Sequence, residues 1–156
     1  MNLIETYELI DALFVDHGTS TDYAASGWAY TNINRTRDND TQLTQTDSST
    51  AGTYRLLNFN GDYCFEFDIK LTEEGSFYVN FRKSTSGKGS VLDSVFRYPD
   101  SNYHHVKLAA KGSTVKVTVD GESKNSVNLS DTWDRFYFNL TSGVTVNYKD
   151  FCYYPI

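Results

Sequence analysis

The clearest pattern in the sequence is a strict alternation of apolar and polar residues over 114–120. Val115, Val117 and Val119 alternate with polar residues, which is the period of a strand with one buried and one solvent-facing side. Lys-Gly precedes this run and Asp-Gly follows it, and glycine forms tight turns because it adopts positive φ without a Cβ clash. The stretch 103–127 therefore predicts three consecutive strands joined by tight turns.

Similar runs, separated by turn-forming residues, continue along most of the chain. We expect strands over 12–16, 28–32, 53–59, 62–71, 75–83, 90–98, 103–111, 114–120, 122–129, 134–140 and 144–154. Residues 33–52 are dominated by Asn, Arg, Asp, Thr, Gln and Ser, which predicts a largely exposed loop with one weak strand at 42–46. Residues 1–10 fit a helical turn or a sheet edge equally well. The pattern predicts an all-β fold in which two antiparallel sheets pack as a β-sandwich, a jelly roll.

The composition indicates one β-rich domain over residues 1–156. With 156 residues, 39% of them hydrophobic, the chain can build the core of one ordinary domain. Twelve Tyr, ten Phe and a single Met suit sheets better than helices. The net charge is −6 and the basic residues are scattered, which argues against nucleic acid and anionic membranes as partners. No apolar run reaches the roughly 18 residues that cross a bilayer, so we expect no membrane insertion, and neutral or hydroxyl-rich ligands.

Cysteines and histidines give few signs of chemistry. Cys64 and Cys152 lie in predicted strands far apart in the sequence, and they fit a disulfide or two free thiols equally well. His104 and His105 are adjacent on a predicted strand, so their side chains point to opposite sides and cannot serve one site. The sequence contains no nucleophile elbow, phosphate loop or zinc-hydrolase motif.

Two segments resemble a known family. Residues 103–121 contain Tyr-His-His-Val-Lys, a glycine turn and Val-x-Val-x-Val-Asp-Gly. This stretch resembles the W-H-x-V…V-x-V-D-G pattern of concanavalin A-like lectin and laminin-G-like domains, with Tyr103 in place of the usual Trp. Residues 144–154 are similar to the closing strand of those jelly rolls and of many carbohydrate-binding modules. The resemblance implies a concanavalin A-like, lectin-like binding module, of a kind also appended to phage tail proteins and adhesins.

Three predicted strands carry an unusual set of solvent-facing residues. In 62–71, 75–83 and 134–140, Phe, Val and Ile alternate with polar residues and tyrosines. If these strands share one sheet, its outer face carries Glu66, Asp68, Tyr78, Asn80, Arg82, Tyr137 and Asn139. Tyrosine rings stack on the C–H patches of pyranoses, while amides, carboxylates and guanidinium groups pair with sugar hydroxyls. We interpret this face as a sugar-binding site; the alternative is an ordinary solvated face whose side chains stabilise strand pairing.

Glu66 and Asp68 also allow a catalytic interpretation. They match the first two acidic positions in the E-x-D-x-x-E strand of concanavalin-like glucanases, but Leu71 stands at the third. Retaining glycosidases need two carboxyl groups about 5–5.5 Å apart, and two carboxylates on one face of a strand could approach that separation. The same Glu-x-Asp pattern also arises on any polar strand face, so a non-catalytic protein is favoured.

Asp16 and Asp150 form a candidate metal site. Jelly-roll carbohydrate-binding modules often hold a structural calcium between their first and last strands, and Asp22 or the carbonyl of Gly18 would add oxygen ligands. The alternative is that Asp16 begins a turn and Asp150 marks a β-bulge at which the inward-facing phase of the last strand changes. No other cofactor is expected.

Three hypotheses of function follow. The first is a non-catalytic carbohydrate-binding module of a larger surface, secreted or viral tail protein. The second is a structural or protein-interaction domain of a phage or adhesive fibre, in which neighbouring domains are the partners. The third is a glycoside hydrolase that uses Glu66 and Asp68. The first two place the protein outside the cell, on a cell surface or on a virion.

Overall fold

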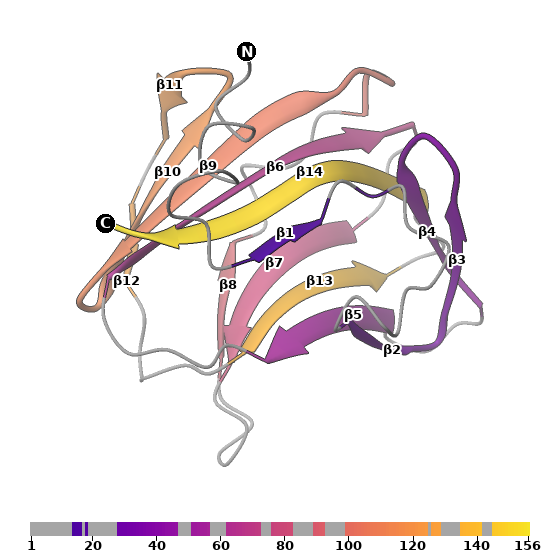
Figure 1. Cartoon of the computed structure of the whole chain (residues 1–156), viewed down its shortest axis with the longest axis horizontal. Helices are drawn as coiled ribbons and strands as arrows, with labels where there is room; N and C mark the ends of the chain where they lie inside the picture. Colours follow the sequence, from indigo (N-terminus) through magenta and orange to yellow (C-terminus); the bar gives the residue numbers. More distant parts are fainter. Residues whose placement is uncertain are drawn as a thin grey trace.

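The structure, a computed structural model, is a pair of stacked β-sheets (Figure 1). It describes residues 14–16, 18, 28–46, 51–56, 62–72, 76–82, 89–92, 99–124, 126–128, 135–141 and 145–156. All regular elements in this part of the chain are strands. Within these residues, no helix has the length and apolar character to cross a membrane. The expected all-β sandwich is therefore confirmed.

The larger sheet has nine strands, and its neighbours run antiparallel. Its main order is β11 (Glu122–Ser123), β10 (Thr114–Val119), β9 (His104–Lys111), β6 (Tyr63–Leu71), β14 (Thr145–Pro155), β4 (Thr41–Gln45) and β3 (Ile33–Arg37). In addition, β1 (Phe14–Asp16) pairs with β14, and β12 (Val127–Asn128) pairs with β10. The predicted strand 122–129 is thus two short strands, interrupted by the polar residues between them.

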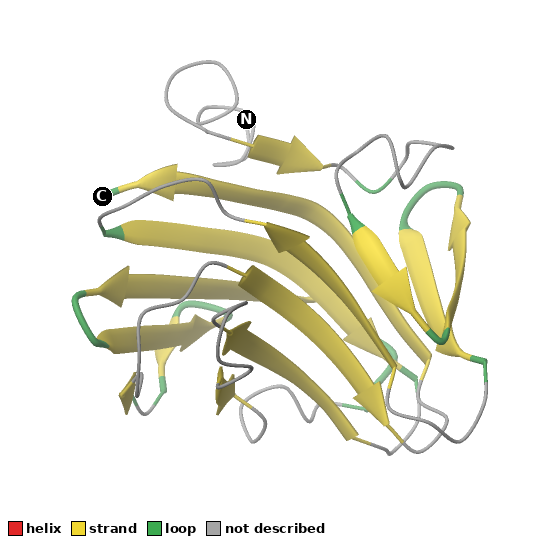
Figure 2. Cartoon of the chain, turned by 90° about the horizontal axis from the view of Figure 1, so that it is seen from below, coloured by secondary structure: helices red, strands yellow, loops and turns green. Residues whose placement is uncertain are grey.

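The smaller sheet has five antiparallel strands. Figure 2 views the molecule from the side on which this smaller sheet lies. Its order is β2 (Ala29–Thr31), β5 (Ala51–Leu56), β13 (Arg135–Thr141), β7 (Ser76–Arg82) and β8 (Gly89–Leu92). These strands confirm the expected segments, apart from shifts at their ends. Residues 1–10, His17, Asp22 and 93–98 lie outside the described residues.

Phenylalanines from both sheets form the centre of the core. Phe65 of β6 and Phe136 of β13 are fully buried, and their ring centroids stack 5.2 Å apart. Phe67 meets Phe138 edge to face at 5.1 Å, and Phe151 of β14 lies 5.2 Å from Phe136. Edge-to-face and offset aromatic pairs add about 0.5–1.5 kcal/mol beyond the area they bury. The alternation seen in the sequence therefore becomes a layer of rings between the two sheets.

The last strand contains a β-bulge at Asp150, as the alternative to a metal ligand predicted. The register of β14 against β6 shifts between Lys149 and Cys152. Asp150 has φ +52°, and the residues on either side of this step, Tyr148 and Phe151, are both fully buried. A bulge places one extra residue in a strand and changes which residues face inward. It allows β14 to bury both aromatic rings although they are three positions apart.

The prediction of a largely exposed loop at 33–52 is wrong for residues 33–37, which form β3, whereas the weak strand predicted at 42–46 is confirmed as β4. Residues 33–45 form the hairpin of β3 and β4, in which Ile33 and Leu43 are buried. The sequence hides this hairpin because Arg37 and Thr41, not apolar residues, occupy inward positions at its turn. The Arg37 side chain is 2% exposed and is bound to Asp16. A buried polar contact between distant segments cannot be read from a local hydrophobic pattern.

The predicted grouping of 62–71 with 75–83 and 134–140 in one sheet is also wrong. β6 is a central strand of the nine-stranded sheet, whereas β7 and β13 are neighbours in the five-stranded sheet. Phe65 and Phe136 stack face to face, so their strands oppose each other across the core. Alternation shows which residues share a side of a strand, but it does not show which strands pair. The predicted polar face is therefore divided between two opposite surfaces of the molecule.

Candidate functional site

The predicted tyrosine and asparagine positions meet on the five-stranded sheet. Tyr137 of β13 is paired with Asn80 of β7, and Asn139 is paired with Tyr78. On the other side of β13, Tyr137 is paired with Tyr54 of β5. Arg82 continues the same row of β7 positions, opposite Arg135. The register thus brings together five of the seven predicted positions and adds Tyr54, which only the pairing of β5 with β13 reveals.

The side chain of Asn139 is buried on this face, with 7% of the residue exposed. Gly52, its partner on β5, gives it room, because a Cβ at this position would lie 2.7 Å from Nδ2 of Asn139 and 3.6 Å from Cδ1 of Tyr137. Within the described part of the chain, Oδ1 of Asn139 has no hydrogen-bond partner. A buried acceptor left unpaired costs about 1–3 kcal/mol. A bound molecule that displaces the groups covering this oxygen would therefore let it gain free energy by accepting a hydrogen bond.

The half-buried ring of Tyr137 lies next to this oxygen along the strand. Its neighbours in the chain, Phe136 and Phe138, are fully buried, so alternation turns Tyr137 outward. Its hydroxyl accepts a hydrogen bond from Nη1 of Arg135 at 3.4 Å. An aromatic ring beside an unpaired amide oxygen is a combination that can bind a molecule with both apolar and hydroxyl groups.

The other two predicted residues, Glu66 and Asp68, lie on the outer side of the nine-stranded sheet, where His105 joins them. His105 of β9 contacts Glu66 Oε1 through Nε2 at 2.8 Å and Asp68 Oδ1 through Nδ1 at 2.7 Å. The Tyr154 hydroxyl donates to the second oxygen of Glu66. This cluster was not predicted from the sequence, because only the register of β6 with β9 places His105 opposite Asp68. His104 binds Asp100 and Asp120 instead, which confirms that the two histidines serve different contacts.

Charge balance in this cluster favours the imidazolium form of His105. Hydrogen bonds to Asp68 and then Glu66 raise the pKa of His105 to about 9, against the opposing effect of burial. Burial alone would raise the pKa of Glu66, but the hydrogen bonds from His105 and Tyr154 lower it overall. At neutral pH the cluster is therefore a cation held between two carboxylates.

We expect an NMR titration of His105 to give a pKa of about 9, and to give a lower value in Asp68→Asn. The folded-state pKa lies above the ordinary value of about 6.5. The contribution of His105 to the free energy of unfolding is therefore complete below about pH 6.5 and is lost as the pH rises towards 9. His104 is the internal control, because Asp68→Asn leaves its partners unchanged. An unshifted His105 in Asp68→Asn would contradict the assignment of Asp68 as its main partner.

The arrangement of Glu66 argues against the proposed glycosidase pair. Glu66 is 1% exposed, and its two oxygens are bound to His105 and Tyr154. A retaining nucleophile must reach the anomeric carbon of a substrate, and a buried carboxylate with both oxygens engaged does not. The cluster instead ties β6 to β9 and β14.

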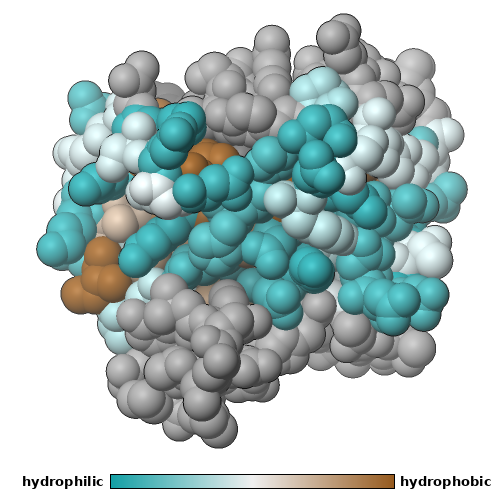
Figure 3. Space-filling view, turned by 90° about the horizontal axis from the view of Figure 1, so that it is seen from above, coloured by the Kyte–Doolittle hydropathy of each residue, from teal (hydrophilic) through white to brown (hydrophobic). Residues whose placement is uncertain are grey.

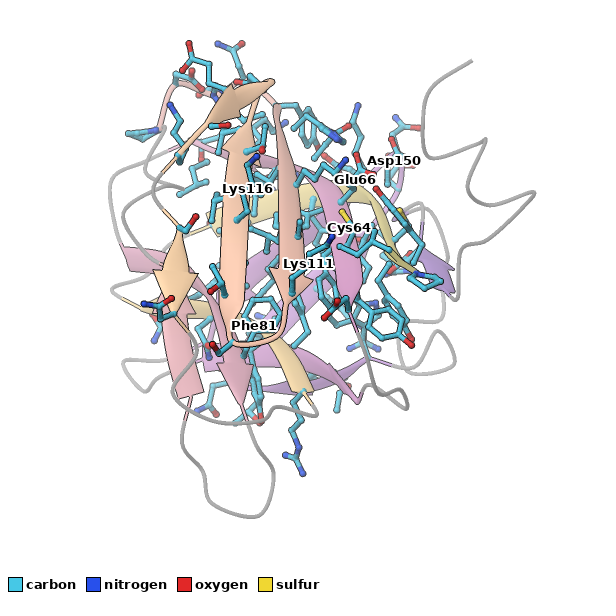
Figure 4. All side chains as sticks on the ribbon, turned by 90° about the vertical axis from the view of Figure 1, so that its left-hand side faces the viewer. Cys64, Glu66, Phe81, Lys111, Lys116 and Asp150 are labelled. Carbon is cyan, nitrogen blue, oxygen red and sulfur yellow. The ribbon has the colours of Figure 1, made fainter. Side chains whose placement is uncertain are left out.

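Both cysteines are buried free thiols, and Cys64 lies on the same strand as Glu66 (Figure 4). The register pairs Cys152 with Glu66 and Cys64 with Tyr154, so the thiols are on adjacent strands. Burial raises the pKa of Cys64 to about 11 and that of Cys152 to about 12. Both thiols are therefore protonated and unreactive at neutral pH.

Asp16 has partners other than a metal ion. Its Oδ2 accepts hydrogen bonds from Nη2 of Arg37 at 2.5 Å, from Nε1 of Trp28 at 2.9 Å and from the Tyr148 hydroxyl at 3.1 Å. Its Oδ1 accepts from the backbone N–H of Gly18 at 2.9 Å. Burial alone would lower the pKa of Arg37, but Asp16 and Tyr148 raise it overall. The guanidinium group thus supplies the positive charge that calcium would bring.

Asp150, the other predicted ligand, lies at the bulge of β14. Asp16 pairs with Phe151 in the register of β1 with β14, and Asp150 is the bulged residue beside it. Among the described residues, no group of three His, Cys, Asp or Glu side chains could hold a metal ion. Calcium binding by Asp16 and Asp150 stays a prediction.

No family model and no curated protein matches the chain. Many solved structures share its fold, among them the following three. A sialidase gives a TM-score of 0.71 with 12% identity. The match covers 94% of this chain but only 19% of the sialidase chain. A β-glucanase from Bacillus licheniformis gives 0.63 with 14% identity, covering 92% of this chain and 97% of the enzyme. The carbohydrate-binding module CBM66 from Bacillus subtilis gives a TM-score of 0.59 with 15% identity, and the match covers 82% of this chain and 95% of the module. The expected resemblance is confirmed at the level of the fold: the chain has a concanavalin A-like, lectin-like jelly-roll fold.

Proposed function

We propose that the protein is a non-catalytic glycan-binding module that uses the outer face of the five-stranded sheet. The observation that carries this proposal is the buried, unpaired Oδ1 of Asn139 beside the outward ring of Tyr137. The shared fold with a carbohydrate-binding module supports it, while the shared fold with two glycosidases makes a test of hydrolysis necessary.

The chemistry of this face suits a pyranose. The C–H side of a sugar ring stacks on tyrosine, and a hydroxyl of the same sugar can donate to the Asn139 oxygen. Tyr54, Tyr78, Asn80 and Arg82 occupy the neighbouring register positions and are proposed to extend the contact to further sugar units. A flat sheet face gives weak binding at each site, and several copies in a larger protein would strengthen it. A place outside the cell or on a virion would suit this role.

The outer face of the nine-stranded sheet is a poorer candidate for neutral sugars. Seen from above, its described surface is mainly hydrophilic (Figure 3). However, its polar groups already bind one another, as in the contacts of His105 with Glu66 and Asp68. A sugar that enters there must break these bonds, whereas the Asn139 oxygen is unpaired within the described part of the chain.

The test is retention on a panel of neutral polysaccharides, measured by affinity electrophoresis and followed by calorimetry with the best oligosaccharide. We expect Tyr137→Ala to weaken binding at least about tenfold, which corresponds to 1.4 kcal/mol, because stacking is lost. Asn139→Leu keeps the size of the side chain, removes the acceptor oxygen and should also weaken binding. Lys116→Ala on the opposite sheet is the matched control, and all variants must retain their near-ultraviolet circular dichroism.

Other outcomes distinguish the alternatives. Concentration-dependent assembly without retention on any polysaccharide would support the fibre-domain hypothesis and refute glycan binding. Release of reducing sugars, lost in Glu66→Gln, would support the hydrolase hypothesis. Equal binding by wild type and Tyr137→Ala would place the site elsewhere.

A further inference from the structure

His104, the first residue of β9, connects the two turns that flank the hairpin of β9 and β10. Its Nε2 lies 2.9 and 3.0 Å from the two carboxylate oxygens of Asp100, in the turn before β9. Its Nδ1 lies 2.6 Å from Oδ2 of Asp120, in the turn after β10. The ring is mostly shielded from solvent, whereas both carboxylates are exposed. A single imidazole is therefore the contact between two exposed turns.

Both ring nitrogens of His104 must carry a proton for these two contacts to be attractive. An ionised carboxylate accepts hydrogen bonds and cannot donate them, so each nitrogen has to be the donor. Burial alone would lower the pKa of His104, but the hydrogen bonds to Asp120 and Asp100 raise it overall. The protonated ring is thus a cation between two anions.

The two carboxylates differ in what else attaches them to the hairpin. Oδ1 of Asp120 also accepts a hydrogen bond from the backbone N–H of His105 at 2.8 Å, and the N–H of Asp120 donates to the carbonyl of His105 at 2.9 Å. Asp100 instead accepts from the backbone N–H of Asn102 at 2.9 Å, within its own turn. The contact of His104 with Asp100 is therefore the one that depends on the charge of the ring.

We propose that His104 is a pH-sensitive switch that holds the turn 100–102 against β9 when the ring is protonated and releases it when the ring is neutral. When the Nε2 proton passes to solvent, a lone pair faces the carboxylate of Asp100 and the contact becomes repulsive. The remaining proton stays on Nδ1, at the shorter contact with Asp120.

The released turn keeps one attachment to β6, because the N–H of Ser101 donates to the carbonyl of Leu71 at 3.0 Å. The folded-state pKa of His104 lies above the ordinary value of about 6.5. The turn is therefore fully held below about pH 6.5 and is released as the pH rises through the folded-state value.

His105 is the neighbouring titratable group that has to be told apart from His104. It points to the other side of β9, where it binds Glu66 and Asp68. The hydrogen bond from His104 lowers the pKa of Asp120 most, and the charge of His105 contributes less. Because the pKa of His105 is about 9, its titration is followed in the same spectra.

The test is an NMR titration from pH 6 to pH 10 that follows both imidazole rings and the backbone amides of Ser101 and Asn102. We expect both amide signals to shift with the midpoint of the His104 ring. Protection of the Ser101 amide against solvent exchange, corrected for its intrinsic rise with pH, should fall at least about tenfold across that midpoint. The amide of Val117, in the middle of β10, is the internal reference and should show no such fall.

The variant Asp100→Asn separates the switch from a simple titration of the ring. It should lower the pKa of His104 and abolish the response of the turn, because the carboxamide N–H can donate to the neutral Nε2. Asp38→Asn, at an exposed aspartate in the turn between β3 and β4, is the matched control and should leave the response unchanged. Turn amides that ignore the His104 midpoint, that follow His105 instead, or that still respond in Asp100→Asn would overturn the proposal.

Discussion

Asp16→Asn is expected to destabilise the protein by about 3–5 kcal/mol, the range found when one partner of a buried ion pair is removed. The side chains of Arg37 and Asp16 are 2% and 3% exposed, and their ion pair measures 2.5 Å. Asparagine keeps the shape of the side chain and removes its charge, which leaves a buried guanidinium group without its counter-charge. The effect should be large because the carboxylate also binds Trp28, which precedes β2, and Tyr148 of β14, both of which are buried in the core.

Urea unfolding followed by tryptophan fluorescence measures this change. Asp120→Asn is the matched control, because Asp120 forms an ion pair with His104 but its side chain is 51% exposed, and exposed pairs contribute about 0–1 kcal/mol. The double variant Asp16→Asn with Arg37→Met should lose less than the sum of the two single variants, since it leaves no buried charge unpaired. Additive losses would show that the two side chains stabilise the fold independently.

The strands were largely predictable from the sequence because alternation is a local property. Val115, Val117 and Val119 identify β10 without knowledge of any other segment. The Asp-Gly turn after them predicts that the chain reverses direction into the next strand, β11. The bulge at Asp150 was also accessible, since Tyr148 and Phe151 require a change of phase if both rings are buried. Local patterns determine these features, and the structure confirms them.

The candidate sites were less predictable because strand pairing is not local. Nothing near Asn139 in the sequence shows that Gly52 lies opposite it and leaves room for its carboxamide. In the same way, Glu66 and Asp68 look like ligands on their own strand, but His105 from β9 occupies them. Residues of one site come from segments that only the fold brings together, so the local pattern supplied candidate side chains and the strand register showed which of them meet.

Arg37 explains why the hairpin of β3 and β4 was predicted as a largely exposed loop. A buried charge contradicts the hydrophobic pattern on which strand prediction depends, and its compensation comes from Asp16, distant in sequence. Buried charges are tolerated when they are paired. The hairpin of β3 and β4 could therefore be recognised only once both members of the pair had been located.

Phe136→Ala is expected to have the second large effect, a loss of about 3–5 kcal/mol in the free energy of unfolding. The ring of Phe136 lies at the centre of the sandwich, with Phe65, Phe138 and Phe151 at centroid distances of 5.2, 5.1 and 5.2 Å. Both sheets contribute these rings, so the cavity left by alanine cannot close without moving one sheet relative to the other. Tyr137→Ala, one residue further on and half-buried on the outer side, should cost much less.

The same pair of variants separates stability from binding. Below its unfolding transition, Phe136→Ala should bind neutral glycans with nearly the wild-type affinity, because its side chain points away from the outer face. Tyr137→Ala should retain most of its stability and lose the binding. Urea titrations and calorimetry on both proteins give the two quantities independently. If Phe136→Ala lost no more stability than Tyr137→Ala, the assignment of the inner and outer faces of β13 would be wrong, and the argument for a glycan site on this sheet would fail with it.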